Sequence, residues 1–248
     1  MQANGLTFSI SAHAAWAPGI TTPDAWAVWA REPARIGEGS DPAVQAMPAM
    51  LRRRAGFLGK MALEVAYACL AGRTGVPTVF CSRHGETKRA VELLGELAKG
   101  EALSPTAFGL AVHNASAGLF SIARADRANH IALAGGEATV EHGVIEACGL
   151  LAEGAPEVLL VVYDAPLPPV LAQFEACDEQ PFAWAWLMTA AAADPISLAL
   201  APAAAGAVLA QDGRGMPGGL EVLRFQLSGA ASHTRVTGAQ QWRWTRHA

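Results

Sequence analysis

The sequence predicts an α/β fold in which a mostly parallel mixed sheet carries helices on both faces. Short apolar runs typical of strands alternate along the chain with longer segments whose apolar residues recur at helical spacing. That alternation favours right-handed βαβ units. Hydrophobic residues make up 52% of the chain, which indicates an extensively buried interior. Because no linker or internal repeat divides residues 1–248, we expect a single domain whose last part, residues 191–248, is an Ala-rich segment followed by edge strands.

Local signals place the individual elements. Thr22 before Pro23 is a helix start signal, and the helix that follows contains Trp26 and Trp29. In residues 50–70 apolar side chains recur on one helical face. Further helices are expected at residues 87–99, 119–128 and 138–151. Strands are expected at residues 6–12, 76–81, 108–113, 131–134, 157–162, 182–188 and 220–227.

The charge distribution argues against several classes of protein. The net charge is −4 and the Lys and Arg residues are scattered, so there is no basic stripe for nucleic acid. Only 16% of residues are charged, which is compatible with a surface that meets a protein partner. Residues 189–210 are Ala-rich but include Asp194, Pro195 and Pro202, so no membrane span is expected. The sequence does not decide whether this segment is helix or loop.

The cysteines and glycines give no metal or cofactor signal. The four cysteines have neither Cys-x-x-Cys nor Cys/His metal-ligand spacing, and no signal peptide opens the chain, so a reducing cytoplasm is the expected location. Gly135-Gly136-Glu137 follows an expected strand but lacks the spacing of a dinucleotide fingerprint. We therefore expect neither a metal nor a cofactor.

Residues 108–122 carry the most informative pattern. An apolar run, expected to be a strand, leads directly into Asn114-Ala115-Ser116-Ala117-Gly118 and then into a helical pattern. A strand followed by a sharp turn and a helix start suits a nucleophile, because backbone N–H groups and the helix dipole stabilise negative charge there. Ser116 lies in this turn and is a candidate for such a nucleophile.

Further segments fit the same larger pattern. They are residues 15–19, 53–70, 79–82, 104–121 and 163–166. In this order they resemble the N-terminal half of a β-ketoacyl synthase, over about residues 5–190, and the sequence AVHNA at residues 111–115 is the most specific part of the match. The chain is most similar to the short ketosynthase-like N-terminal-domain family encoded beside aryl polyene and related type II polyketide genes, whose members look like chain-length-factor subunits.

The resemblance implies half of a thiolase-like (ketosynthase) fold without a complete catalytic set. The family's nucleophile is a cysteine where this chain has Ser116, and the family's later His-Gly-Thr-Gly-Thr and Asn-Ser-Phe-Gly segments do not occur. The resemblance therefore implies a non-catalytic partner of a full-length ketosynthase in aryl polyene, type II polyketide or fatty-acid-like biosynthesis. Such a pair would work with an acyl carrier protein that carries the acyl or polyene chain.

The resemblance also implies where the partner binds. In ketosynthase dimers the strand that enters the nucleophile turn pairs with its twin across the two-fold axis, so residues 108–113 would be the paired edge. The implied interface residues are Phe108, Leu110, Val112, His113 and Asn114. An acyl tunnel shared by both subunits is implied as well, and its candidates are Phe108, Leu110, Val112 and Phe120.

Other interpretations of Ser116 stay open. As a weak nucleophile it would make the protein a hydrolase or acyltransferase for acyl thioesters, with Asp164 and His233 following in the hydrolase chain order. As a structural residue, Ser116 or Asn114 would cap the helix that follows. A self-contained homodimer that scaffolds the carrier protein is a further hypothesis.

Two other segments are contact candidates. Arg83, His84 and Glu86 follow an expected strand end, where α/β folds place binding sites, and would contact the partner or the carrier protein. The alternative is a helix start that the Glu86 carboxylate stabilises. Near the C-terminus, Trp242 and Trp244 would share one face of a strand that either docks as the last edge strand or inserts at a partner surface.

Overall fold

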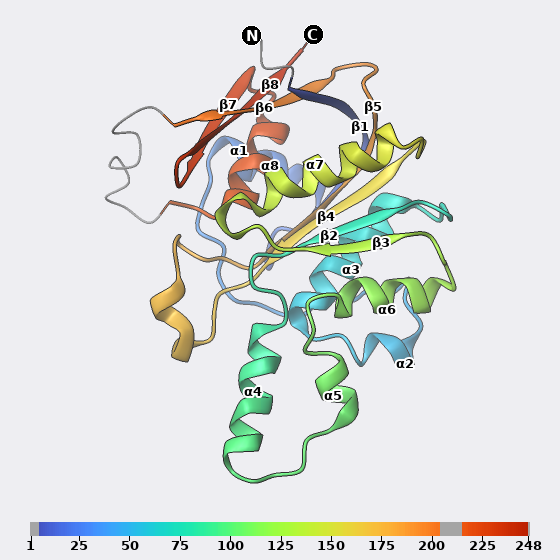
Figure 1. Ribbon diagram of the computed structural model, residues 1–248, viewed down its shortest axis with the longest axis vertical. Helices are drawn as coiled ribbons and strands as arrows, with labels where there is room; N and C mark the ends of the chain where they lie inside the picture. The colour runs from blue at the N-terminus through green and yellow to red at the C-terminus, as the bar shows by residue number, and fades with distance from the viewer. Residues whose placement is uncertain (1–4, 204–214, 248) are drawn as a thin grey trace.

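The computed structural model describes residues 5–203 and 215–247. A mixed sheet of eight strands, in the order β3-β2-β4-β5-β1-β6-β8-β7, carries helices on both faces (Figure 1). The strands are β1 (Leu6–Trp16), β2 (Thr78–Cys81), β3 (His130–Leu133), β4 (Val158–Asp164), β5 (Phe182–Ala190), β6 (Ile196–Pro202), β7 (Ser232–Thr237) and β8 (Gln240–Arg246). The helices are α1 (Pro23–Arg31), α2 (Ala49–Arg52), α3 (Phe57–Leu70), α4 (Thr87–Ala98), α5 (Pro105–Gly109), α6 (Ala115–Arg124), α7 (Thr139–Ala152) and α8 (Gly218–Ser228), with short 3-10 helices η1 (Gly136–Ala138) and η2 (Pro169–Phe174).

The predicted α/β class with helices on both faces is confirmed, but antiparallel neighbours outnumber parallel ones. β2 pairs in parallel with β3 and β4, and the other five pairs of neighbouring strands are antiparallel. Loop length explains one of them, because only residues 238–239 connect β7 to β8 and a parallel pair needs a crossover of about a dozen residues or more. The apolar pattern identified most strands without identifying their neighbours.

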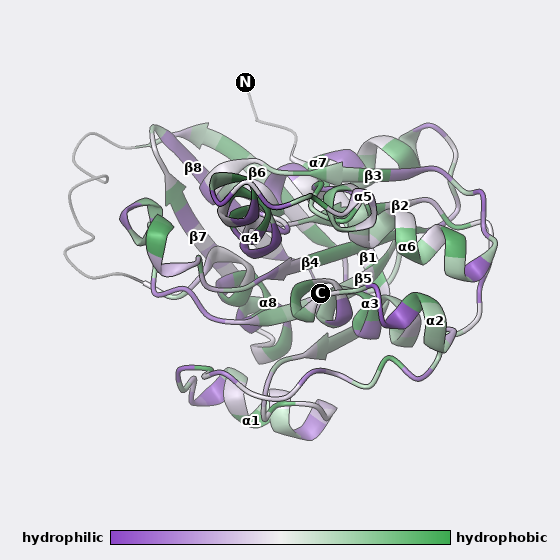
Figure 2. Ribbon diagram, turned by 90° about the horizontal axis from the view of Figure 1, so that it is seen from below, coloured by the Kyte–Doolittle hydropathy of each residue, from purple (hydrophilic) through white to green (hydrophobic). Residues whose placement is uncertain are grey.

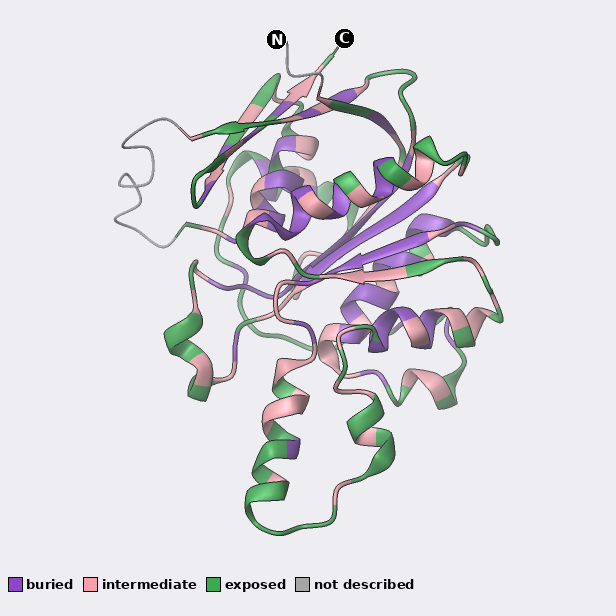
Figure 3. Ribbon diagram, viewed as in Figure 1, coloured by how far each residue is buried: buried purple, intermediate pink, exposed green. Residues whose placement is uncertain are grey.

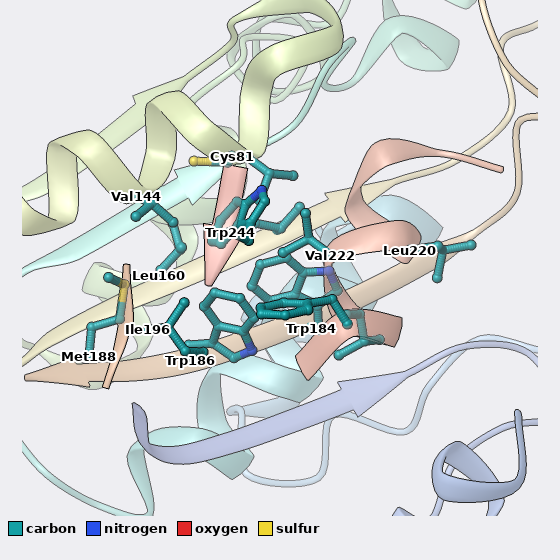
Figure 4. Packing of buried hydrophobic residues seen from close by; sticks show 14 of the residues in the cluster. Cys81, Val144, Leu160, Trp184, Trp186, Met188, Ile196, Leu220, Val222 and Trp244 are labelled. Atoms are coloured by element: carbon teal, nitrogen blue, oxygen red, sulfur yellow. The ribbon is translucent and has the colours of Figure 1, made fainter. Parts of the chain in front are cut away.

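Two hydrophobic cores lie on opposite faces of the sheet. Side chains of β5 pack alternately into one core and the other, because successive side chains of a strand point to opposite faces of the sheet. Trp184 and Trp186 join the core under α1, α7 and α8, where their ring centroids are 4.4 Å apart and Trp244 lies close by (Figure 4). Ala185 and Leu187 join the core under α3 and α6. Most of β2 and β4 is accordingly coloured as hydrophobic in Figure 2.

The C-terminal strand docks onto the sheet, as one of the two hypotheses for it predicted. Trp242 and Trp244 both face the core and are 1% and 0% exposed. β8 lies between β6 and β7, however, so the edge strand on this side of the sheet is β7. Insertion of these tryptophans at a partner surface is therefore excluded, since both are already buried within the chain.

Residues 108–113, predicted to be a strand, are not one. The chain forms the short helix α5 up to Gly109 and then turns until α6 begins at Ala115. The reason lies just upstream. The Ser104 hydroxyl accepts a hydrogen bond from the Ala107 N–H (3.3 Å), and Pro105 suits the first helical turn, so residues 105–109 begin a helix despite their β-type composition.

Residues 220–227 are also helical rather than extended. They form most of α8, whose buried residues Leu220, Leu223 and Phe225 face the core. Gly229 ends this helix with φ +67°, a left-handed conformation that glycine adopts without a steric penalty.

Two helices project from the body of the protein (Figure 1). α4 contributes a single buried residue, Leu93, and α5 contributes none, so both are largely exposed (Figure 3). Their outer surface includes the apolar side chains of Leu94, Leu97 and Phe108, which are 57–64% exposed. We refer to residues 86–112 as the projecting hairpin.

The Ala-rich segment is partly extended. β5 reaches Ala190 and β6 covers Ile196–Pro202, whereas residues 204–210 lie outside the described part of the chain. Among the described helices, none is both long and apolar enough to cross a membrane.

Candidate functional site

A polar network closes the carboxyl ends of the parallel strands β2 and β4. The Asp164 carboxylate at the end of β4 accepts hydrogen bonds from the Ser82 hydroxyl (2.9 Å) and from the Arg83 N–H (2.8 Å). The Ser82 hydroxyl oxygen in turn accepts from the Gly85 N–H (2.8 Å). Burial raises the pKa of Asp164 to about 6, even though these hydrogen bonds favour its charged form. The turn after β2 is thus held by a buried carboxyl group.

Glu179 ties the same turn to the long loop that follows β4. Its carboxylate accepts from the Leu167 N–H (2.7 Å), and its Oε1 lies 3.3 Å from His84 Nε2 and 3.9 Å from Arg83 Nη1. Burial opposes its ionisation, but the hydrogen bonds from His84 and Leu167 outweigh burial and hold the pKa of Glu179 below its ordinary value. Arg83 and His84, two of the predicted contact residues, are therefore brought together here.

Two cavities open on either side of this turn. A polar cavity of about 250 Å³ is lined by Arg83, Asp164 and Arg235 and by the starts of η1 and α8. An apolar cavity of about 560 Å³ lies between the starts of α3 and α4 and residues 165–169. His84 lines both cavities. Cavities of this size, at the ends of parallel strands, are common binding sites in α/β folds.

The cations of the polar cavity are already paired. Arg235 donates to the Glu221 carboxylate (2.7 Å), to the Glu137 carbonyl (3.1 Å) and to the Glu141 carboxylate. Glu141 is 0% exposed, and Arg235 is the buried partner of its carboxylate. Arg235 thus joins β7, α7 and α8 around the cavity and leaves little positive charge for an anionic ligand.

His113 closes the base of the projecting hairpin. Its Nε2 lies 3.0 Å from the Ser82 carbonyl oxygen, so Nε2–H donates to it, and its buried Nδ1 has no partner among the described residues. The ring packs directly on Gly85, where an added methyl group would lie 3.4 Å from it. Burial lowers the pKa of His113. The side chain predicted to face a partner instead joins the two ends of the hairpin to β2.

The free edge of the sheet next to this site is β3. It pairs with β2 alone, and its chain continues through Gly135 and Gly136 into η1 and α7. Gly136 has φ +60°, and a methyl group on Gly135 would lie 2.8 Å from His142 Nδ1, so this sharp turn requires two glycines. The sequence predicted the strand and the helix on either side of this turn. It gave Gly135 and Gly136 no role beyond the rejected comparison with a dinucleotide-binding fingerprint.

Ser116 does not lie on a sharp turn after a strand. It sits in the first turn of α6, is 2% exposed, and its hydroxyl hydrogen-bonds the Tyr163 hydroxyl. The residues proposed to activate it have other partners, since Asp164 accepts from Ser82, and His233 stacks on the Phe225 ring. The hydrolase arrangement is therefore not assembled. The predicted cap is not formed either, because Asn114 occupies the N-cap position of α6 without a side-chain hydrogen bond and Ser116 lies within the helix.

The comparisons with known proteins point in one direction. A family model described as β-ketoacyl synthase, N-terminal domain, matches residues 26–245. The chain belongs to this family.

Solved structures of ketosynthase complexes share the fold. A chain from the structure of the ketosynthase ApeO in complex with its chain length factor ApeC, from Xenorhabdus doucetiae, is 26% identical with a TM-score of 0.85, over 97% of this chain and 100% of that chain. The ishigamide ketosynthase/chain length factor aligns at 14% identity and a TM-score of 0.63, over 91% and 74% of the two chains. A β-ketoacyl synthase from Burkholderia phymatum STM815 aligns at 11% identity and a TM-score of 0.61, over 92% and 71%. No curated protein matches the chain. The predicted thiolase-like ketosynthase fold is confirmed.

The cysteines of this family member do not supply a thiolate. Burial raises the pKa of Cys69 to about 12 and those of Cys148 and Cys177 to about 11, and it raises the pKa of Cys81 as well. The thiolate is the nucleophilic form of cysteine, so at neutral pH each of the four is a protonated side chain. Within residues 5–203 and 215–247, no group of three or more His, Cys, Asp or Glu side chains could hold a metal ion.

The predicted tunnel residues divide into two groups. Phe108 and Val112 are 64% and 42% exposed, whereas Phe120 is 3% exposed and packs against Tyr67 and Phe80 in the core. Leu110 is partly buried at the edge of the same core. None of the four lines the two cavities described above, whose apolar wall residues the sequence did not single out.

Proposed function

We propose that this chain is a non-catalytic, chain-length-factor-like partner of a full-length ketosynthase. The observation that carries the proposal is the turn after the edge strand β3, which leads from a strand into a helix and holds Gly135 and Gly136 but no cysteine. We propose that this turn corresponds to the one where a condensing enzyme of this family would need a thiolate. A nucleophile there would sit beside a helix start, which stabilises developing charge. We propose this turn in place of the predicted position at Ser116, because Ser116 follows no strand.

The partner would pair with the β3 edge. An edge strand exposes unpaired N–H and C=O groups, and a strand of a second subunit satisfies them. β3 takes the role that the sequence analysis gave to residues 108–113. The exposed Phe108 and Val112, on the projecting hairpin, would add an apolar contact to the same interface.

The likeness to known complexes supports this reading. The alignment with this chain covers the whole of the matched chain in the structure of ApeO with ApeC. That structure contains a ketosynthase together with its chain length factor. A further structure of the same fold pairs an acyl carrier protein with its ketosynthase in a type II polyketide synthase. We propose the same classes of partner here, in aryl polyene or related type II polyketide biosynthesis.

The apolar cavity is our candidate for the part of the acyl tunnel that this subunit contributes. Its walls include Phe57, Leu58 and Leu167, and its floor adjoins the projecting hairpin through α4. His84 and Glu86 line the apolar cavity, so we propose that they meet the acyl chain of the carrier protein rather than its outer surface, whereas Arg83 lines the polar cavity. A hydrocarbon chain in this cavity would have its depth limited by side chains of both subunits.

Condensation assays test the proposal. The purified chain, a full-length ketosynthase from the same organism, and the two together would each be supplied with acyl and malonyl thioesters on a carrier protein. We expect no carbon–carbon bond formation by the chain alone, and longer products from the pair than from the ketosynthase alone. Product lengths that do not change when the chain is added would refute the proposal.

A further inference from the structure

The wall of the apolar cavity combines hydrocarbon side chains with several charged ones, among which Glu86 stands out. Its interior surface is formed largely by the hydrocarbon side chains of Phe57, Leu58 and Leu167 and by prolines of the loop after β4. Glu86, the residue before α4, also lines this cavity and is only partly exposed. A carboxyl group in such surroundings loses hydration and needs a replacement hydrogen bond.

Nothing in the described chain supplies that hydrogen bond. No side chain or backbone group of the described residues donates to the Glu86 carboxyl, although Arg89 and Glu92 influence it electrostatically. Burial raises the pKa of Glu86 above its ordinary value, which means that the neutral form is favoured relative to a free carboxyl group. An ionised carboxyl group accepts hydrogen bonds, and a protonated one can also donate.

The start of α3 makes room for this carboxyl group. A methyl group added to Gly59 would lie 3.2 Å from Glu86 Oε1, and one added to Gly56 would lie 3.5 Å from Glu86 Oε2. The absence of side chains at these two positions therefore lets the carboxyl group lie between α3 and α4, at the boundary of the cavity. Its position is fixed by the fold rather than by a polar partner.

The other charges around the cavity limit what the ligand can be. Lys88 and Arg89 line it and oppose a cationic ligand, whereas three acidic residues besides Glu86 line it and oppose an anionic one: Glu38, Asp41 and Glu92. The apolar wall favours hydrocarbon. A neutral molecule with a hydrocarbon body and a single hydrogen-bonding group satisfies all of these conditions.

We propose that Glu86 hydrogen-bonds a hydroxyl group on an acyl chain or aromatic acyl group held in the apolar cavity. The hydroxyl donates to, or accepts from, the carboxyl group that the chain itself leaves without a partner. Glu86 would thereby select hydroxylated chains over plain hydrocarbon chains. This inference rests on the proposed acyl-binding role of the cavity and adds the chemical class of the ligand.

A matched pair of probes tests the proposal. The N-acetylcysteamine thioesters of 4-hydroxycinnamate and cinnamate differ by one hydroxyl group, and their binding would be measured by calorimetry with the chain alone and with its ketosynthase complex. One buried hydrogen bond gives about a tenfold difference in dissociation constant. We expect the hydroxylated probe to bind about tenfold more tightly to the wild-type protein.

Two variants separate Glu86 from the rest of the cavity. Glu86→Met keeps the volume and removes the hydrogen-bonding group, so both probes should then bind equally. Glu92→Gln is the control, because Glu92 lines the same cavity but is exposed, and here the tenfold preference should persist. Equal binding of the two probes to the wild-type protein, an undiminished preference in Glu86→Met, or no binding of either probe would overturn the inference.

The outcome is separable from that of the proposed function. Complex formation with the ketosynthase is measured without any probe, by gel filtration. A chain that forms the complex but shows no preference for the hydroxylated probe loses only the role of Glu86. A chain that shows the preference but forms no complex keeps that role and loses the proposed partnership.

Discussion

Phe108 offers the sharpest test of the proposed partner surface. It lies on α5 of the projecting hairpin with 64% of its surface exposed. Complete burial of a phenylalanine side chain stabilises by about 1.5–3 kcal/mol, so covering the exposed two-thirds would contribute about 1–2 kcal/mol to binding. That corresponds to about a five- to thirtyfold change in dissociation constant. Phe108→Ser should therefore weaken the complex with the ketosynthase by this factor, as measured by biolayer interferometry.

The control for this experiment is another exposed phenylalanine. Phe174 is 60% exposed on η2, outside the projecting hairpin, and Phe174→Ser should leave the affinity unchanged. Neither substitution should lower the thermal midpoint of the isolated chain appreciably, because exposed side chains contribute little to its stability. If Phe108→Ser binds the ketosynthase as tightly as Phe174→Ser, the hairpin is not part of the interface and the reasoning is wrong.

Three further predictions concern the chain by itself. His113→Phe keeps a ring over Gly85 but removes the hydrogen bond that His113 donates to the Ser82 carbonyl oxygen. Amide hydrogen exchange of residues 86–112 should therefore become about fivefold faster. Unchanged exchange would show that His113 does not hold the hairpin. Gly143→Ala places a methyl group 2.5 Å from Cys81 Sγ, so chemical denaturation should show that the free energy of unfolding falls by about 1–3 kcal/mol. Adding Cys81→Ala should restore part of this free energy, because it removes the sulfur atom that the methyl group meets. A loss of the same size in the double variant would contradict the packing argument. Asp164 has its pKa raised from 3.8 to about 6, so the folded protein binds this proton more tightly than the unfolded chain, and the resulting stability is complete below pH 3.8 and is lost as the pH rises through about 6. Asp164→Asn mimics the neutral form and so does not lose this stability. Between pH 4 and 7, denaturation should show that the free energy of unfolding of the wild type falls by up to about 3 kcal/mol more than that of the variant. If the free energies of unfolding of the two proteins change equally with pH, the raised pKa of Asp164 is wrong.

Local sequence patterns predicted most elements because those elements follow local rules. The apolar spacing in residues 57–70 does form the buried face of α3, and the Trp242 and Trp244 alternation does form a strand with one buried face. The pattern failed at residues 108–113, where a β-type composition follows a strong helix cap at Ser104. Here the cap, which involves only nearby residues, outweighed the composition.

The proposed shift of the nucleophile position from Ser116 to the turn after β3 depends on a different kind of information. Two segments, residues 108–118 and 131–137, each read as an apolar run followed by a small-residue turn and a helix. Which run is a strand at the free edge of the sheet depends on long-range pairing with β2, which no local pattern reveals. The family resemblance identified the fold correctly.

The cavities could not be predicted from the sequence, because they too depend on long-range contacts. The walls of the apolar cavity come from residues near 40, 57, 86 and 167, which are far apart in the chain. Within one short stretch, Phe108 is 64% exposed and Phe120 is 3% exposed, although both were candidates for the same tunnel. Only the tertiary arrangement separates a residue that faces a partner from one that fills the core.

The most direct test of the central claim is the mass of the co-expressed proteins, measured by light scattering after gel filtration. We predict a single species whose mass equals one copy of this chain plus one copy of the full-length ketosynthase. Two separate peaks, with this chain eluting as a monodisperse monomer beside a ketosynthase homodimer, would contradict the account.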